Sequence, residues 1–474
     1  MTEPGRLARC LHCLPSLKSS GAVLLGALFL AWPAFYNGFP LVYADSMSYL
    51  AGGGPVARAV FLHQTSVYYG MRSFFYALGI LIFHWNLSPW PIVALQCLLV
   101  AFVLWLVSRA MLPRRSVPCY LALVICLSLF TTVSWYSSIV LPDILGPLLY
   151  LAFYLLAFAR ESLARGERRA LYAIACWAVT AHATHLMLAA GLCLLVALIL
   201  AVERKPLRRV LGSTAEVAAI VLVASLAQLA LNGFLYGKPS LNGERPAYLT
   251  ARIIADGPGR RYLQANCNHL HWVVCGHLDR LPDDPDDFLW APDGIWQTDT
   301  DAENQQLVRE EMPFVLATVR AYPRQQLARS SRNFWQQLNQ FGLYDLNPIG
   351  WVADEFGSVM PAAQSGYIRG RQAHEAVPLE LFSDIQYWVV LLCLATVSLG
   401  MIAGFIPRVF GRRPARLLEL GAMVLVMLVA NALLTGVLSM PDDRYEARVI
   451  WLLPMVAGLM GMSWFSRGAE EANG

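Results

Sequence analysis

The feature that most constrains this chain is a series of long apolar segments separated by short polar loops. A helix of about 20 apolar residues crosses the hydrocarbon core of a bilayer. Charged residues make up only 14% of the 474 residues, and the mean hydropathy of +0.48 is too high for a water-soluble fold. The sequence therefore predicts a polytopic membrane protein. Candidate spans lie near 21–40, 88–111, 117–134, 142–159, 211–231, 385–406, 415–438 and 447–466.

The apolar stretch 170–202 has a polar break from His182 to His185. A single crossing here would place two basic loops on opposite sides of the membrane, so we interpret the stretch as two shorter helices that meet at the break. Together with the other candidates, this predicts an all-α fold with about ten transmembrane helices. No small-residue cleavage site follows the first apolar run, so we expect it to be kept as a span rather than removed as a signal.

The orientation follows from the cations, because short loops rich in Lys and Arg stay cytoplasmic. The alternate loops, around 134–142 and 182–185, carry none. We therefore expect both termini to lie in the cytoplasm, and we expect the membrane to be a bacterial inner (plasma) membrane. The basic loops contain Arg109, Arg114 and Arg115; Arg160, Arg165, Arg168 and Arg169; Arg204, Lys205, Arg208 and Arg209; and Arg408, Arg412, Arg413 and Arg416.

This topology divides the chain into three parts. An N-terminal transmembrane module, 1–231, includes a first outer loop, 41–87, which we expect to lie partly along the membrane surface. A hydrophilic extracytoplasmic segment follows at 232–384, and transmembrane helices return at 385–474. The outer segment holds 13 Lys and Arg against 19 Asp and Glu, so it is acidic although the whole chain carries +4. Nothing here indicates nucleic-acid binding.

The outer segment has local signals of its own. The Pro- and Asp-rich stretch "PDDPDDFLWAPDGIW" is expected to be a loop without a helix. From Asp301 onward, apolar residues recur at helical spacing and are interrupted at Pro323, which predicts two amphipathic helices. Cys267 and Cys275 are the only cysteines in this segment, where an oxidising compartment would permit a disulfide. Whether they pair is left open.

Two carboxylates stand at the outer edge of the membrane module. Asp45, in "YADSMSYL", comes just after the first span, with Tyr49 one helical turn further on. Asp143, in "LPDILGPLL", opens the fourth span. An ionisable residue at such a depth usually marks a cavity or a site. The alternative for Asp143 is helix capping after a proline, which the helix dipole favours.

Two further elements carry polar groups to the same face. His182 and His185 are three residues apart, and we expect hydrogen-bonded histidines or donors to an anion rather than metal ligands. Arg444 and Tyr445 enter the last span from outside and are candidates for holding a phosphate, whereas snorkelling to the surface is the default for Arg448. We expect no cofactor. A lone pair, Cys10 and Cys13, is weak evidence for a metal, and a divalent metal requirement is left open.

These motifs resemble the GT-C superfamily of integral-membrane glycosyltransferases, especially protein O-mannosyltransferases and the lipid A aminoarabinose transferase. The matching features are "ADSMSY" with Asp45 and Tyr49, "PDILGPLL" with Asp143, and "DDRYEARVIWLLP" with Arg444 and Tyr445. The passage "LVREEMPFVLATVRAYPRQQLARSSRNF" is similar to a helix-Pro-helix segment in outer domains of such proteins. One departure is that Ser46, rather than a second acid, follows Asp45.

The resemblance implies a polyprenyl-phosphate-linked sugar as donor and an extracytoplasmic lipid, glycan or protein as acceptor. Asp45 would act as general base, and inversion at the anomeric carbon would need no enzyme nucleophile. Arg444, with His182 or His185, would stabilise the leaving phosphate. Tyr49, Asp143 and Tyr445 would complete the substrate-binding set.

Two rival functions stay open. A transporter or flippase for a lipid-linked saccharide is one, although such carriers often show internal repeats and this chain shows none. A catalytically silent relative that binds lipid or scaffolds a partner is the other, and the missing second acid after Asp45 keeps it open. The 150-residue outer segment favours an enzyme or binding domain over a carrier.

Overall fold

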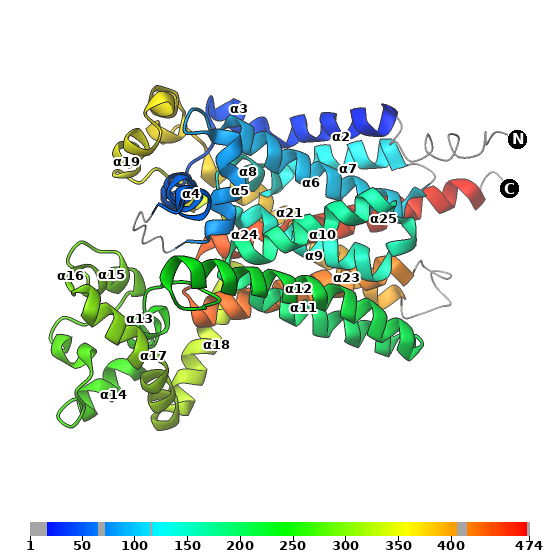
Figure 1. Cartoon of the computed structure of the whole chain (residues 1–474). Coiled ribbons are helices and arrows are strands. Elements are labelled where there is room, and N and C mark those ends of the chain that lie inside the picture. Colours follow the sequence, from blue (N-terminus) through cyan, green and yellow to red (C-terminus); the bar gives the residue numbers. More distant parts are fainter. Residues whose placement is uncertain (1–16, 65–71, 114–115, 405–414, 472–474) are drawn as a thin grey trace, which may run out of the picture.

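The computed structural model describes residues 17–64, 72–113, 116–404 and 415–471, whose elements are all helices. The main body is a bundle in which long helices run side by side (Figure 1). Its helices are α2 (Leu17–Leu30), α6 (Trp90–Met111), α7 (Ser116–Phe130), α9 (Leu145–Phe158), α10 (Arg165–Ala181), α11 (Ala183–Val202), α12 (Leu207–Tyr236), α21 (Leu379–Gly404), α23 (Ala415–Leu438), and α24 (Asp443–Ile450) with α25 (Leu452–Glu471).

Six helices in the described part are long and apolar enough to cross a membrane, which is consistent with an integral membrane protein. They are Trp90–Met111, Ala183–Val202, Leu207–Tyr236, Leu379–Ala403, Arg416–Leu438 and Asp443–Trp464. The helices Lys18–Leu30, Phe74–His84, Ser116–Phe130 and Pro142–Phe158 are apolar but shorter. The count of ten spans therefore stays a prediction, because several predicted spans form helices of only 10–17 residues.

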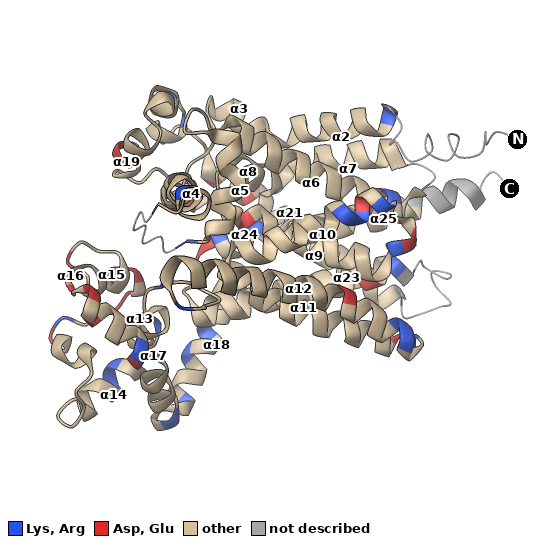
Figure 2. Cartoon of the chain, viewed as in Figure 1, with Lys and Arg blue, Asp and Glu red and all other residues tan. Residues whose placement is uncertain are grey.

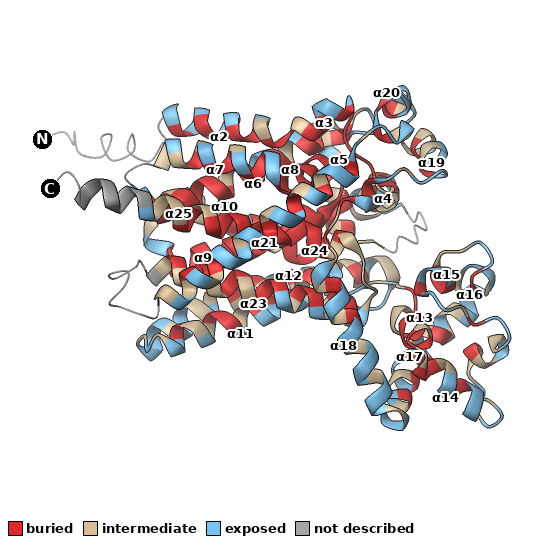
Figure 3. Ribbon diagram, turned by 180° about the vertical axis from the view of Figure 1, so that it is seen from behind, coloured by how far each residue is buried: buried red, intermediate tan, exposed pale blue. Residues whose placement is uncertain are grey.

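The outward faces of the bundle helices are apolar. Leu194 of α11 is 74% exposed, and Trp388 and Leu392 of α21 are 68% and 69% exposed. In Figure 3, exposed residues follow the outer faces of these helices while buried residues fill the interior. Large apolar side chains left open along whole helices are expected where lipid, rather than water, is the solvent.

The predicted break within 170–202 is confirmed. Helix α10 ends at Ala181, His182 adopts an extended conformation, and α11 begins at Ala183. The side chain of His182 accepts a hydrogen bond from the backbone N–H of Thr184, so it caps α11. A polar N-cap residue between two apolar stretches is thus the local cause of the break.

The first outer loop forms two helices, α4 (Ala44–Leu62) and α5 (Phe74–His84). Helix α4 is seen end-on in Figure 1 whereas the bundle helices lie lengthwise, so α4 runs across the bundle axis. The location of this loop along the membrane surface stays a prediction, for which α4 has the required direction. Lys and Arg residues gather at the opposite end of the bundle, where α2 begins (Figure 2).

The outer segment contains two packing units rather than one. A first unit has its own apolar core, which includes Leu263, Phe288, Leu307 and Phe314, and it contains the Cys267–Cys275 disulfide. Its helices are α13 (Tyr248–Ala255), α14 (Pro258–Asn266), η4 (Val273–His277), α15 (Pro285–Leu289), α16 (Ile295–Thr298) and α17 (Asp301–Ala321). We refer to these residues, 247–321, as the outer unit.

The rest of the outer segment belongs to the main body. Helix α18 (Pro323–Asn339) packs on α23, and Phe341, Phe356 and Tyr367 join the main apolar core. These residues come from the stretch that forms η5 (Tyr344–Leu346), α19 (Val352–Val359), η6 (Pro361–Ala363), α20 (Gln364–Arg369) and η7 (Gln372–His374). The helix interruption predicted at Pro323 is confirmed, because α17 ends at Ala321 and α18 begins at Pro323.

The expectation of a helix-free loop in "PDDPDDFLWAPDGIW" is wrong. Helix α15 forms because the Asp284 carboxylate accepts from the backbone N–H of Asp286 and Pro285 takes the first helical position. An aspartate N-cap followed by proline is a helix-start signal, and here it outweighed the turn-forming composition. Some predicted features lie outside the described residues, namely Cys10, Cys13, Arg114, Arg115, Arg408, Arg412 and Arg413.

Candidate functional site

An isolated β-bridge brings the two predicted acids together. The backbone N–H of Leu41 donates to Ser138 at 2.9 Å, and that of Val140 donates to Leu41 at 3.1 Å, which makes a parallel bridge between Leu41 and Ile139. Asp45 lies four residues after one strand of this bridge, and Asp143 lies four residues after the other. The bridge therefore fixes the starts of α4 and of the η2 turn (Pro142–Ile144) side by side.

The third partner is supplied by the start of α24. Asp442 caps this helix by accepting from the backbone N–H of Arg444 at 2.9 Å. Gln337 of α18 holds Asp442 in turn, because its amide donates to the Asp442 carbonyl at 2.8 Å and accepts from the Asp442 N–H at 3.0 Å. The backbone of Arg444 is thus held by Asp442, and the backbone of Asp442 is held by Gln337.

Arg444 connects the two acids through its guanidinium group. Nε and Nη2 donate to the two oxygens of Asp143 at 2.9 and 3.0 Å, and Nη1 donates to Asp45 at 2.8 Å. The ring of Tyr43 lies 4.8 Å from the guanidinium carbon. Asp143 is fully buried, so its bidentate ion pair with Arg444 is shielded from water. The guanidinium group compensates the buried negative charge of Asp143.

Arg448 lies one turn deeper and completes the cluster. It is fully buried, and its Nη1 donates to Asp143 at 3.1 Å. The default explanation that Arg448 snorkels to the surface is therefore wrong, since the buried carboxylate of Asp143 holds it inside. The capping alternative for Asp143 is also not observed, because neither η2 nor α9 has a side-chain cap hydrogen bond.

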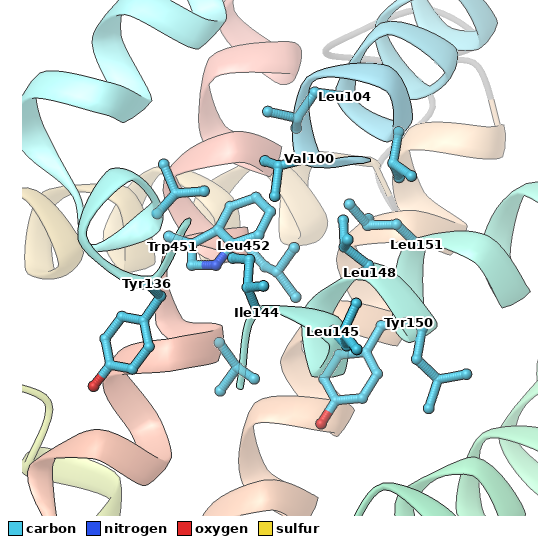
Figure 4. Packing of buried hydrophobic residues seen from close by; sticks show 14 of the residues in the cluster. Val100, Leu104, Tyr136, Ile144, Leu145, Leu148, Tyr150, Leu151, Trp451 and Leu452 are labelled. Carbon is cyan, nitrogen blue, oxygen red and sulfur yellow. The ribbon is translucent and has the colours of Figure 1, made fainter. Parts of the chain in front are cut away.

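The apolar core supports this cluster from below. Figure 4 shows Ile144, the neighbour of Asp143, and Trp451, which follows α24, among the side chains of one packed group. The indole of Trp451 donates to the carbonyl of Arg448 at 3.0 Å. Both Ile144 and Trp451 are fully buried, so the floor of the site is rigid packing rather than loop.

One residue of the cluster was missed at the sequence level. Arg72, in the first outer loop, forms an ion pair with the oxygen of Asp45 that Arg444 does not hold. Burial alone would raise the pKa of Asp45, but the charges of Arg72 and Arg444 keep that pKa below its usual value. Asp45 is therefore ionised at neutral pH. Arg72 could have been recognised as a cation in a loop that the topology predicts to lie outside, where the positive-inside pattern expects few cations.

The cluster opens into a cavity of about 470 Å³. Asp45, Arg72 and Arg444 line it together with residues of the outer unit and of the loop before α19. A second cavity of about 340 Å³ adjoins it, and both are lined by Arg72, His182, Tyr248, Ser439 and Tyr445. The second cavity extends between the outer ends of α11, α12 and α23 and has many apolar lining residues, including Phe74, Met187, Leu241, Leu434 and Leu438.

The predicted substrate-binding residues are placed differently with respect to these cavities. Tyr445 and His182 line both, and Tyr49 lines only the apolar one. His185 lines neither. It is fully buried, its Nδ1 lies 2.8 Å from the carbonyl of Ala178, and its ring faces Gly146, where a β-carbon would come within 3.0 Å of Nε2.

The histidines thus have separate environments. His182 caps α11 at the cavity wall, whereas His185 is packed in the core. Of the two histidines, only His182 is therefore placed to bind an anion in the cavity. Among the described residues, no group of three or more His, Cys, Asp or Glu side chains is arranged to hold a metal ion.

Two carboxyl groups, those of Asp345 and Asp442, bind the backbone N–H of Arg444 at the start of α24. Asp345 accepts from the backbone N–H of Arg444 at 2.6 Å and shares a hydrogen bond with Asp442. Burial, together with the hydrogen bond and charge of Asp442, raises the pKa of Asp345 to about 9. Asp345 is therefore protonated at neutral pH and donates to Asp442, which lines the cavity.

This pair predicts a stability that falls at alkaline pH. The pKa of Asp345 is raised in the folded state, so its contribution to stability is complete at acid pH and is lost as the pH rises toward about 9. Thermal unfolding of the detergent-solubilised protein should give a melting temperature that falls between about pH 6 and pH 9. Asp345→Asn should flatten this fall. Parallel profiles for the two proteins would show that Asp345 does not hold the proton.

Comparisons with known proteins identify no relative. No family model, no curated protein and no solved structure matches the chain. Function must therefore be argued from the site itself.

Proposed function

We propose that this protein is a membrane glycosyltransferase that moves a sugar from a polyprenyl-phosphate donor to an extracytoplasmic lipid, glycan or protein acceptor. The observation that carries the proposal is a carboxylate, Asp45, and two guanidinium groups, Arg72 and Arg444, on the wall of one cavity at the end of an apolar bundle. A single displacement at an anomeric carbon requires a base for the acceptor hydroxyl and cationic groups for the leaving phosphate, placed next to each other in one cavity.

In this reaction the acceptor oxygen forms a bond to the anomeric carbon while the bond from that carbon to the phosphate oxygen breaks. The electron pair of the broken bond leaves with the phosphate. Asp45 takes the proton of the acceptor hydroxyl. Arg72 and Arg444 neutralise the charge that accumulates on the phosphate, and guanidinium groups suit this task because they present several donors in a plane.

The ion pairs around Asp45 give the phosphate a second role. With the site as described, both oxygens of Asp45 accept from guanidinium groups, which makes it a poor base. A phosphate that binds Arg72 and Arg444 competes for the same donors. Binding of the donor therefore releases Asp45 to accept a proton, so that the base becomes active only when a sugar is in place.

The adjoining apolar cavity fits the lipid part of such a donor. It meets the cluster at Arg72, His182 and Tyr445 and continues between α11, α12 and α23 toward apolar residues such as Leu434 and Leu438. A phosphate at the junction would place an isoprenoid chain along these side chains. The burial of apolar surface would add to the affinity.

Substitution of the two guanidinium residues should weaken use of the donor. Arg72→Gln removes a charge whose ion pair is with Asp45, and Arg444→Lys keeps the charge but loses the fork that spans Asp45 and Asp143. We expect the KM for the phosphate-linked donor to rise by about 10- to 100-fold in each variant, because each loses a charge-assisted hydrogen bond. Unchanged donor dependence would remove both residues from the site.

A lipid-binding protein without catalysis is the second candidate. It is favoured by the full pairing of Asp45 with arginines in the absence of substrate. Such a protein would bind a polyprenyl phosphate and transfer nothing.

Mass spectrometry of envelope glycans and lipids from cells that lack the gene tests the proposal. A hexose or pentose mass that disappears and returns on complementation would identify the donor and acceptor class. Spectra identical to those of the parent cells would reject transfer as the function and favour the second candidate.

A further inference from the structure

The proposed reaction leaves one wall of the larger cavity without a role. That wall is made by α15 of the outer unit, through Pro285, Asp286, Leu289 and Trp290, and by the loop before α19, through Ile349 and Trp351. Both segments are distant in sequence from the membrane helices that carry Asp45 and Arg444. The cavity is therefore closed by two pieces of chain that have no part in base or phosphate chemistry.

Trp290 is directed toward the reacting groups. Its ring lies 5.9 Å from the guanidinium carbon of Arg72, the residue that pairs with Asp45. Trp290 thus makes a cation–π contact with Arg72, which in turn pairs with the proposed base, Asp45. Trp351 lines the same cavity and is 53% exposed, so its ring is accessible to a ligand.

Carboxylates accompany the two rings. Asp286 and Asp442 line the same cavity. Burial and the neighbouring charges of Asp284 and Asp442 raise the pKa of Asp286 to about 6, so it is mostly ionised at neutral pH and able to accept hydrogen bonds. A cavity lined by both aromatic rings and carboxylate acceptors matches a ligand that has apolar C–H faces and hydroxyl edges.

We propose that this wall recognises the sugar. Trp290 and Trp351 pack against the C–H faces of a pyranose or furanose ring, and Asp286 accepts hydrogen bonds from its hydroxyls. The volume of about 470 Å³ lies in the range of small-molecule sites and leaves room for a monosaccharide beside a phosphate. The inference rests on the proposed function, because it takes the occupant of the cavity to be a glycosyl group. It adds that the outer unit together with the loop before α19, rather than the membrane helices that carry Arg444, selects which sugar is used.

Isothermal titration of the purified full chain in detergent tests this inference. The probes are glucose, galactose, mannose and arabinose 1-phosphates, with inorganic phosphate as the reference. The wild-type protein should bind one sugar 1-phosphate at least about tenfold more tightly than inorganic phosphate. Trp351→Ala and Asp286→Asn should remove that preference while leaving the affinity for inorganic phosphate unchanged.

Matched variants serve as controls. Trp335→Ala changes a tryptophan of α18 that is 60% exposed and does not line the cavity, and Asp287→Asn changes the exposed neighbour of Asp286. Both should keep the wild-type preference. Trp290→Phe keeps an aromatic ring where Trp290→Ala could disturb the core of the outer unit, and it should retain part of the preference.

The outcomes separate the inference from the proposed function. The inference that this wall recognises the sugar is overturned if the wild-type protein does not prefer any sugar 1-phosphate over inorganic phosphate. It is also overturned if the preference survives in Trp351→Ala and Asp286→Asn. Either result counts even if envelope analysis demonstrates transfer. A preference that both variants lose supports the wall, and it does so even if deletion of the gene leaves the envelope unchanged. In that case the cavity binds a sugar without transferring it.

Discussion

Asp45→Asn is expected to abolish sugar transfer while leaving the protein folded in the membrane. Asparagine keeps the shape of the side chain but cannot take the proton of the acceptor hydroxyl. General-base catalysis contributes about 10²- to 10⁴-fold, so the product should fall by at least about 100-fold. The measurement is the abundance of the glycosylated species in the envelope of deletion cells that express the variant, at a protein level matched to wild type.

Asp354→Asn is the control for this experiment. Asp354 is an exposed acid of α19 on the same side of the molecule, and it does not line the cavity. Cells with this variant should contain the normal amount of product. Transfer at the normal rate by Asp45→Asn would mean that Asp45 is not the base, and Asp442, another acid that lines the cavity, would become the residue to substitute.

Asp143→Ala is expected to destabilise the protein severely. Asp143 is fully buried and compensates Arg444 and Arg448, both of which are themselves buried. Removal of one partner from a buried ion pair costs about 3–5 kcal/mol, because the remaining charge has lost its compensation in a medium of low dielectric constant. Thermal unfolding of the detergent-solubilised protein should show this as a large fall in melting temperature.

Two companion variants identify the cause. Asp143→Leu combined with Arg448→Met replaces both charges by apolar groups, and it should be less destabilised than Asp143→Ala alone. Glu161→Ala removes an ion pair with Arg416 in which Glu161 is 61% exposed, and it should cost less than about 1 kcal/mol. If the double variant were no more stable than Asp143→Ala, the loss would come from packing around η2 or from Arg444, rather than from an uncompensated Arg448.

The interruptions between helices were the part of the fold that the sequence predicted best. The polar residues at 182–185 were enough to locate the break between α10 and α11, because an apolar helix has few reasons to contain a capping residue. The interruption at Pro323 was equally clear. The number of spans could not be fixed, since apolar runs near 21–40 and 117–134 end as helices too short to count by length alone.

The meeting of Asp45, Asp143 and Arg444 followed from a similar argument. Polar groups at one depth of several spans gain from sharing a cavity, and the structure brings these three within hydrogen-bond distance. Their chemical roles stay predictions. The pairing pattern was not predictable, because it depends on the bridge between Leu41 and Ile139, and isolated bridges leave no periodic signal in a sequence.

The errors share a physical cause. Arg448 was assigned to the surface by its residue type, but its position one turn after Arg444 directs it to the same buried carboxylate. Helix α15 was hidden in a segment rich in Asp and Pro, although Asp284 and Pro285 stand in the order that starts a helix. In both cases the position of a residue within its helix outweighed residue type or composition.

The central claim is that a lipid-linked phosphate binds where Asp45, Arg72 and Arg444 meet. Native mass spectrometry of the purified protein with undecaprenyl phosphate, in competition with undecaprenol, tests it directly. The account predicts one retained undecaprenyl phosphate per chain, poor competition by the alcohol, and loss of binding when Arg72→Gln is combined with Arg444→Lys. Equal retention of the alcohol, or full binding by the double variant, would contradict it.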